Sequence, residues 1–454
     1  MPFVRTDDIR VEVSQWMQQK FEYLNLGERI TALGIDALKE SEPMAYRLIL
    51  AVGDLECKES VEYIKIDGYS GPEEDQSCFT IKGITLDIQV YRLHTDDAAA
   101  AAVTLAGDDG DDDVLQQLRL VSLPNTSLDG LWESLVYAGN MHTDLLRLAT
   151  RMVTMTRSHS FDKALINWNG LFLLHGPPGS GKTTLCRGIA QKLKIRLGRT
   201  YTNGKLIELH TDALFSKFFG ESGKIVGRIF DRIEQVASSD DETLLCIIID
   251  EIETLVGPRE NSAFGGEVAD AMRVTNGILT ALDRLRHRPN VMVLCTSNMV
   301  DAIDSAFLDR ADMIQLVPNP GPDAVYSILQ SSLNEFIKHK VLISTTVCAP
   351  RTPPSTDSSV NASNSAMDDA SAVMQDPTLF PSLEVLELMA AEDSIARKLW
   401  YFAKQCFGMS GRNLRRLPSK AVGLFTYSEQ PTVGEVLDAL QMTVDRERSM
   451  TTGL

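Results

Sequence analysis

The sequence predicts an α/β protein whose parallel sheet is flanked by helices, with a small α+β domain before it and a helical region after it. Apolar runs of strand length at 171–174, 244–249 and 291–296 alternate with amphipathic helical stretches, the pattern that parallel sheets require. A glycine-rich loop at 176–183 directly follows the first run. Beyond Pro318 the apolar spacing becomes helical. The central α/β region is therefore where we expect the chemistry.

The N-terminal region predicts the small α+β domain. Alternating apolar residues at 9–13 and at 84–90 have the period of half-buried strands, and residues 24–39 between them have a helical spacing. We place this domain at 1–107. The aspartate-rich stretch that follows has the composition of a solvated linker, and we place an acidic linker at 108–127.

The remaining chain divides into two parts. We place the large α/β subdomain at 128–318 and the helical part at 319–454. A helix is expected to begin near Asp323, since apolar residues recur on one of its faces. Residues 349–378 are rich in Pro, Ser, Asn and Asp, which predicts a disordered insertion.

Composition limits the classes of partner. The 454 residues carry a formal charge of −18, and an acidic surface repels phosphate backbones, so we expect no direct nucleic-acid ligand. No apolar run approaches the roughly 20 residues that cross a bilayer, and the N-terminus lacks an apolar signal segment, which predicts an intracellular protein without a membrane partner. The seven cysteines are odd in number and dispersed, so we expect reduced thiols rather than disulfides or a zinc site.

The strongest motif is the glycine-rich loop. A buried strand precedes it and a helical stretch at 185–193 follows, which is the context of a loop that binds phosphate at a helix N-terminus. Glycines let backbone N–H groups turn toward phosphates, Lys182 supplies a charge to the β and γ phosphates, and the Thr183 hydroxyl can ligate Mg²⁺. A chance glycine turn is the alternative. The predicted nucleotide-binding residues are Gly176, Pro177, Pro178, Gly179, Ser180, Gly181, Lys182, Thr183 and Thr184.

Two further strand ends carry polar side chains. The apolar run 244–249 ends in Asp250 and Glu251, of which the first can hold Mg²⁺ through water and the second can act as the base that activates water. The run 291–296 is followed by Asn298, which can bridge the γ-phosphate and that water. Acidic residues also end strands because strands end in solvent, and Asn commonly caps turns. Beside the glycine-rich loop we favour the catalytic interpretation of all three.

These motifs, in this order, resemble the AAA+ superfamily of P-loop ATPases, and within it the family of the pachytene checkpoint ATPase, called thyroid hormone receptor interactor thirteen in animals. The resemblance runs from about residue 128 to the C-terminus and is fainter before it. The segments that carry it are 131–137, 173–182, 214–224, 304–312 and 409–418.

The resemblance implies a function. Proteins of this family assemble as homo-hexameric rings that use ATP and Mg²⁺ to remodel HORMA-domain clients, converting closed states to open ones, in meiotic recombination control and the spindle checkpoint. The family's N-terminal domain recruits the client or its adaptor, and 1–107 would do so here. The resemblance further implies a location in the nucleus and on chromosomes, and also in the cytoplasm.

The resemblance also assigns residues. Phe218 and Phe219 match an aromatic pore loop that grips the client, the alternative being core residues of a helix at 213–233. Arg310 matches the finger that reaches the neighbouring subunit's nucleotide, although this chain has one arginine where common AAA+ proteins have two. Arg412 matches the lid's sensor arginine. A surface ion pair is the alternative for each arginine, and a second pore loop would fall near 259–267.

Other functions stay open at this point. A proteolysis-linked unfoldase is disfavoured because the chain carries no His-Glu-x-x-His motif. A DNA-associated AAA+ ATPase such as a clamp loader is disfavoured by the acidic balance. A scaffold that binds ATP without turnover is disfavoured because Lys182 and Glu251 are both present.

Overall fold

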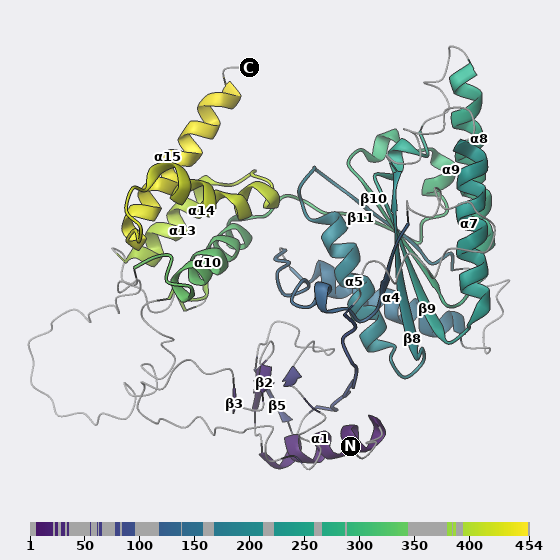
Figure 1. The fold of residues 1–454 in the computed structure, drawn as a ribbon, viewed down its shortest axis with the longest axis horizontal. Coiled ribbons are helices and arrows are strands. Elements are labelled where there is room, and N and C mark those ends of the chain that lie inside the picture. Colours follow the sequence, from purple (N-terminus) through teal and green to yellow (C-terminus); the bar gives the residue numbers. More distant parts are fainter. Residues whose placement is uncertain are drawn as a thin grey trace, which may run out of the picture. The chain divides into compact units, whose positions relative to one another are not determined.

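The computed structural model divides into two compact units, Met1–Arg92 and Leu93–Leu454, and Figure 1 traces their helices and strands. The structure describes residues 6–20, 23–25, 29–31, 34–35, 55, 61, 63–65, 78–81, 84–95, 118–137, 139–157, 168–211, 222–257, 266–286, 288–343, 379–383, 385–386 and 394–452. Among these residues no helix is long and apolar enough to span a membrane.

The first unit joins one helix to two small sheets. Strand β1 (Tyr23–Asn25) pairs antiparallel with β5 (Cys78–Thr80). Strand β2 (Arg29–Thr31) pairs antiparallel with both β3 (Gly34–Ile35) and β4 (Tyr63–Lys65). The mixed α+β character predicted for this region is therefore confirmed, but its elements lie elsewhere in the sequence than expected.

The strand expected at 9–13 is wrong, because helix α1 spans Thr6–Lys20. Its buried residues Ile9, Val13 and Met17 recur every fourth position on one helical face, whereas Val11 is 57% exposed. The apolar residues at positions 9, 11 and 13 alternate only by chance, because the buried positions of this segment follow the period of a helix.

The helix expected at 24–39 is also wrong, since the described residues there form β1, β2 and β3. Two of their partners, β4 and β5, lie 30 residues or more further along the chain, and such distant pairing overrides local helical spacing. Residues 84–90 form no strand in the part of the chain that the structure describes. Their alternation is nevertheless real: Ile84, Leu86, Ile88 and Val90 pack on the unit's core, while Thr85 and Asp87 are exposed.

The second unit is built on a six-stranded sheet, confirming the predicted α/β class. Its order is β11-β7-β10-β9-β8-β6, and all neighbours are parallel except β6, which is antiparallel to β8. The strands are β6 (Leu118–Ser122), β7 (Leu171–His175), β8 (Asn203–His210), β9 (Thr243–Asp250), β10 (Val291–Ser297) and β11 (Met313–Leu316).

Helices cover both faces of this sheet. Helices α4 (Met141–Arg157) and α5 (Lys182–Arg196) lie on one face, and α7 (Ser222–Ser239) and α8 (Gly266–Leu285) on the other (Figure 1). Strand β9 shows why both faces must be covered: Leu245, Ile247 and Ile249 belong to the core under α7 and α8. The intervening Leu244, Cys246 and Ile248 belong to the core under α4 and α5. Such a strand reads as a continuous apolar run.

The predicted linker 108–127 needs a correction. Its second half contains β6, whose register with β8 runs from Leu118 opposite Leu209 to Ser122 opposite Lys205. The linker was predicted from the acidic composition of residues 108–113, and its predicted end lay too far along the chain, inside the sheet. The other predicted domain boundaries stay predictions.

A helical bundle follows the sheet, as predicted. Its helices are α10 (Pro322–Lys338), α13 (Ile395–Gln405), α14 (Gly411–Phe425) and α15 (Val433–Thr452). They share one core, in which the rings of Tyr326 and Trp400 pack edge to face with their centroids 5.9 Å apart. Helix α10 begins at a proline, which suits the first turn because no N–H is needed there. The predicted insertion 349–378 lies outside the described residues.

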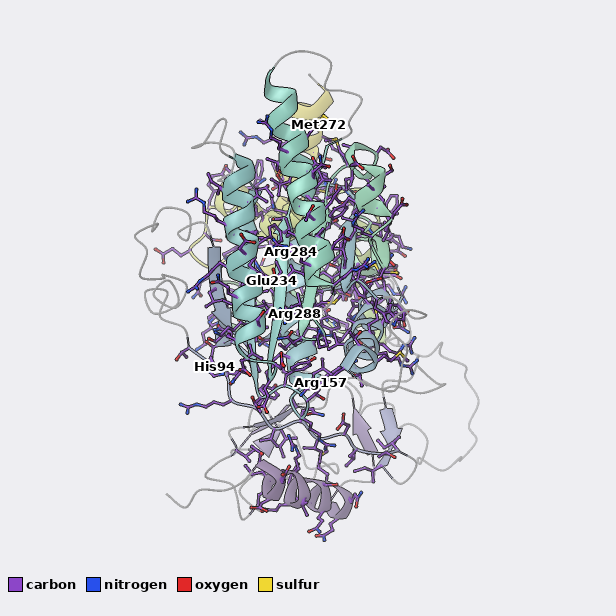
Figure 2. The ribbon with its side chains drawn as sticks, turned by 90° about the vertical axis from the view of Figure 1, so that its right-hand side faces the viewer. His94, Arg157, Glu234, Met272, Arg284 and Arg288 are labelled. Atoms are coloured by element: carbon purple, nitrogen blue, oxygen red, sulfur yellow. The ribbon has the colours of Figure 1, made fainter. Side chains whose placement is uncertain are left out.

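Figure 2 shows α7 and α8 side by side on the face of the sheet that they cover together. Arg284 of α8 pairs with Asp231 at 2.8 Å and with Glu234 at 3.3 Å, both on α7. These side chains are partly exposed, so such pairs add little to stability, and apolar packing beneath them holds the two helices together. Cys186, Cys246, Cys295 and Cys406 are buried free thiols.

Asn290 should be a strong stabiliser of this unit. It is 1% exposed, and its Nδ2 donates to the carbonyls of Ala237 (3.0 Å), Asp240 (3.3 Å) and Thr243 (3.1 Å). Asn290→Ala removes the donor and leaves buried carbonyls unpaired, which should lower the unfolding free energy by roughly 1–3 kcal/mol. Urea unfolding checks this against Asn276→Ala, an exposed position on α8. Equal midpoints for the two variants would contradict it.

Candidate active site

The parallel sheet brings three polar strand ends to one edge. Strands β7, β10 and β9 are neighbours, with Ser297 opposite His175 and Cys295 opposite Ile249. Because the carboxyl ends of parallel strands point the same way, the segments that follow them meet at this edge. The glycine-rich loop follows β7, Asp250 ends β9, and Asn298 follows β10.

The glycine-rich loop has a backbone that only glycine suits at its first position. Gly176 has φ +146°, and a Cβ there would lie 2.3 Å from the Val317 carbonyl oxygen. Gly181, the N-cap of α5, has φ +98° and no side-chain cap. The first N–H groups of α5 therefore face the loop without a capping side chain, as an anion site at a helix N-terminus requires.

Lys182 lies at the centre of the site and is 6% exposed. Its Nζ donates to the carbonyl oxygens of Gly176 (2.8 Å) and Pro177 (2.9 Å) and to Oδ1 of Asn298 (2.9 Å). Burial lowers the pKa of Lys182, and the nearby carboxylates of Asp250, Glu253 and Glu251 act in the opposite direction. The ammonium is thus held by polar oxygens that a phosphate could replace.

Asp250 connects the loop to the neighbouring strands. Its Oδ1 accepts hydrogen bonds from Thr183 Oγ1 (2.9 Å) and from Thr296 Oγ1. Thr183 is the second residue of α5, and Thr296 is buried near the end of β10. The structure therefore brings the two residues predicted to hold Mg²⁺, Thr183 and Asp250, into direct contact.

Glu251 directly follows β9 in a left-handed conformation, with φ 53° and ψ 52°. This conformation is uncommon for residues other than glycine and is found at functional sites. The backbone N–H of Glu251 donates to Thr296 Oγ1 at 3.2 Å, and its exposed side chain accepts from Nδ2 of Asn298 at 3.3 Å. One amide, that of Asn298, therefore contacts both Lys182 and Glu251.

The loop has the features that a nucleotide's phosphates need. The Ser180 hydroxyl is buried and has no hydrogen-bond partner among the described residues, so it is available to a ligand. Pro178 is exposed at the tip of the loop, and Thr184 is half-buried in the first turn of α5. No group of three or more His, Cys, Asp or Glu side chains in the described part could hold a metal by itself. A Mg²⁺ ion here would depend on phosphate and water for its other ligands.

The helical bundle contacts the same loop. The backbone N–H of Arg412, in the first turn of α14, donates to the Gly179 carbonyl at 3.2 Å. A Cβ on Gly179 would lie 3.0 Å from Ser410, the N-cap of α14. The Arg412 side chain is exposed and acts electrostatically on Lys182. The structure therefore places Arg412 at the glycine-rich loop of its own chain.

Arg310 lies apart from this cluster. Its guanidinium makes a bidentate pair with Asp283 of α8, at 3.0 and 2.9 Å, and donates to the Ala306 carbonyl at 2.7 Å. Its carbonyl accepts from Asn169 Nδ2 at 2.8 Å. No hydrogen bond or ion pair joins it to the described residues of its own phosphate loop. Within one chain, Arg310 therefore forms the ion pair that was its alternative interpretation. Its predicted action on a neighbouring subunit stays a prediction.

The predicted pore residues Phe218 and Phe219 lie outside the described residues, as does most of the second predicted pore loop. Three residues in contact with the predicted site residues were not predicted from the sequence. They are Thr296, which donates to Asp250, Asp283, which pairs with Arg310, and Glu253, which accepts from the Asn298 backbone N–H at 2.8 Å. Only Glu253 left a signal, a second acidic residue just after a predicted strand end.

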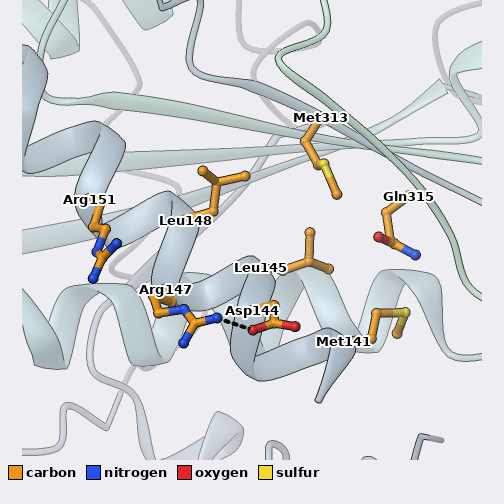
Figure 3. Close-up of a pocket in the computed structure, with 8 residues that line it drawn as sticks. All are labelled: Met141, Asp144, Leu145, Arg147, Leu148, Arg151, Met313 and Gln315. Carbon is orange, nitrogen blue, oxygen red and sulfur yellow. Dashed lines mark hydrogen bonds and ion pairs between the residues drawn. The ribbon is translucent and has the colours of Figure 1, made fainter. Parts of the chain in front are cut away.

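A hollow of about 580 Å³ lies between α4 and β11. Figure 3 shows it lined by apolar side chains such as Leu145 and Met313, with Arg147 turned toward Asp144, which it contacts at 2.6 Å. None of its lining residues belongs to the glycine-rich loop or to the strand ends. The hollow is therefore separate from the polar cluster described above.

Comparisons with known proteins cover nearly the whole chain. Residues 172–319 match the model of the ATPase family associated with various cellular activities (AAA). Residues 321–448 match the TRIP13-like AAA+ ATPase lid C-terminal domain, and residues 2–96 match the TRIP13 N-terminal domain.

Individual proteins give the same result. The chain is 32% identical over 390 residues to a pachytene checkpoint protein 2 homolog of Danio rerio, covering 86% of this chain and 82% of that protein. It is 38% identical over 330 residues to the Arabidopsis thaliana homolog, covering 72% of this chain and 66% of that protein. The solved structure of C. elegans PCH-2 matches with a TM-score of 0.70 and 25% identity over 98% of this chain and 97% of that one.

Two substitutions should separate nucleotide binding from hydrolysis. Lys182→Ala removes the buried charge at the loop and should weaken ATP binding itself. Glu251→Gln keeps the shape of the side chain but removes the carboxylate predicted to act as the base, so ATP should bind normally and be hydrolysed roughly 10²-fold or more slowly. Direct nucleotide binding and phosphate release, measured on both variants, check the split. Normal turnover by Glu251→Gln would show that another group is the base.

Proposed function

Because the chain belongs to the pachytene checkpoint protein 2 family of AAA ATPases, we propose that it uses ATP hydrolysis to remodel HORMA-domain proteins. The reaction would open a closed, partner-wrapped client or dismantle its complex. The ATPase core and the lid match this family, as does the N-terminal domain, which we propose recruits the client through an adaptor. The observation that carries the hydrolytic part is the Asn298 amide, which joins Lys182 to Glu251.

The roles of the residues follow from their contacts. Lys182 would exchange the Gly176 and Pro177 carbonyls for phosphate oxygens, since its charge is better paired by an anion. Asn298 would orient the attacking water, and Glu251 would accept its proton. Thr183 and Asp250 would hold Mg²⁺, which neutralises charge on the phosphates when bound.

Assembly would complete the site. In a homo-hexameric ring, Arg310 of one subunit would reach the nucleotide of the next, exchanging the Asp283 carboxylate for phosphate oxygens. Phe218 and Phe219 would line the pore and grip the client, and Arg412 would sense the nucleotide from the lid. We place this activity in the nucleus, on chromosomes, and also in the cytoplasm, in meiotic checkpoint control and the spindle checkpoint.

Mixed rings test whether Arg310 acts across subunits. Arg310→Ala should lower turnover by as much as ~10³-fold while nucleotide still binds. Mixing these subunits with Lys182→Ala subunits should restore part of the activity, because an intact loop can then meet an intact finger. The control replaces the second partner by the double variant Lys182→Ala/Arg310→Ala, which offers no finger. Equal activity with both partners at every mixing ratio would contradict action in trans.

The remodelling step itself needs a client assay. A purified HORMA-domain protein closed around a labelled peptide should release that peptide when chain, adaptor and ATP are added. Phe218→Ala/Phe219→Ala should abolish release while basal ATP hydrolysis stays within a few-fold, since neither residue is assigned to the nucleotide. Tyr427→Ala, which removes an aromatic side chain that is 96% exposed, is the matched control. A pair variant that loses ATPase activity and melts early would instead favour a core position.

A further inference from the structure

Glu253 lies beside the catalytic cluster without an assigned role. It belongs to the short 3-10 helix η5 (Ile252–Thr254), which begins directly after Glu251. Its Oε1 accepts the backbone N–H of Asn298 at 2.8 Å. Its Oε2 is buried and has no hydrogen-bond partner among the described residues. A carboxylate oxygen that is buried without a hydrogen-bond partner costs free energy, so its presence needs a reason.

The bond to Glu253 is one of the hydrogen bonds with backbone N–H donors that fix the turn after β10. The Ser297 carbonyl accepts from Gly176 N–H at 3.2 Å, which ties the turn to the phosphate loop. The Ser297 hydroxyl accepts from Met299 N–H at 3.0 Å, a local bond within the turn. Of these bonds, only the one from Glu253 holds Asn298 itself, and it comes from the segment that carries Glu251.

The orientation of the Asn298 backbone decides where its side chain points. The amide must place Oδ1 at 2.9 Å from Lys182 Nζ and Nδ2 at 3.3 Å from Glu251 Oε1. An Asn side chain has two rotatable bonds, so a small rotation of its backbone would break one of these contacts. Fixing the backbone N–H of Asn298 therefore also fixes the positions of Oδ1 and Nδ2 of its side chain.

We propose that Glu253 is a positioning residue for hydrolysis, which holds Asn298 so that one amide serves Lys182 and Glu251 together. The proposal rests on the assignment of Asn298 made above. Glu253 makes no hydrogen bond to Glu251 or to the glycine-rich loop among the described residues, although its charge acts electrostatically on Lys182. We assign its effect on turnover to its bond with Asn298. Its role requires an acceptor oxygen and not a negative charge.

Substitutions at Glu253 separate position from charge. Glu253→Ala removes the acceptor and should slow ATP turnover at saturation roughly 10- to 100-fold, the range for residues that orient a neighbouring active-site group. The dissociation constant for ATP, measured by direct binding, should change by less than about twofold. Glu253→Gln keeps an amide oxygen that can accept the Asn298 N–H, and should recover most of the turnover. Asp301→Ala, at an exposed carboxylate in the neighbouring 3-10 helix η7 (Val300–Ala302), should behave as the unaltered protein.

A double variant tests the route. If Glu253 acts through the Asn298 side chain, Glu253→Ala/Asn298→Ala should be no slower than Asn298→Ala alone. Independent, multiplying losses would overturn the proposal, as would Glu253→Gln turning over as slowly as Glu253→Ala. A slow Asn298→Ala with an unaffected Glu253→Ala would overturn this proposal alone. Full turnover by Asn298→Ala would overturn both the proposal and the function assigned to Asn298.

Discussion

The buried charge of Lys182 is the constraint on which the site depends. Lys182 as a residue is only 6% exposed, so its ammonium needs oxygen partners, because an unpaired charge in the interior is very costly. Two of its partners are loop carbonyls, so the backbone at Gly176 must take a conformation that turns them inward. The third is the Asn298 amide, so the turn after β10 must approach the loop. The same ammonium joins the glycine-rich loop to the turn after β10 and remains able to exchange its partners.

Both the sheet and the helical bundle, which forms the lid, contribute contacts around the glycine-rich loop. Parallel order places the loop, the Asp250 carboxylate and the Asn298 turn at one edge. From the lid, the Arg412 N–H bonds the Gly179 carbonyl, and Arg415 donates to the Ser134 carbonyl at 2.7 Å. Ser134 precedes Tyr137, whose hydroxyl donates to the Gly181 carbonyl at 3.4 Å. A ligand that moves the loop therefore acts directly on contacts made by the lid.

The sequence predicts this region well because its signals are local. Two motifs can be recognised from a few neighbouring residues. One is the glycine-rich loop between a buried strand and a helix, and the other is the pair of carboxylates at the end of a continuous apolar run. The roles of Thr296 and Asp283 depend on strand pairing and helix packing across the sheet, which no local pattern records. The N-terminal unit was harder for the same reason: β1 and β2 are three residues each and pair with distant strands, so helical spacing at 24–39 was misleading.

When nucleotide binds, we expect Lys182 to exchange the carbonyl oxygens of the loop for phosphate oxygens. A crystal structure of the chain with Mg²⁺ and a non-hydrolysable ATP analogue tests it most directly. In that structure we expect Lys182 Nζ to leave the Gly176 and Pro177 carbonyls for phosphate oxygens, with Asn298 still beside it and the metal between Asp250 and the phosphates. A nucleotide bound elsewhere, such as in the hollow between α4 and β11, with the Lys182 bonds unchanged, would contradict it.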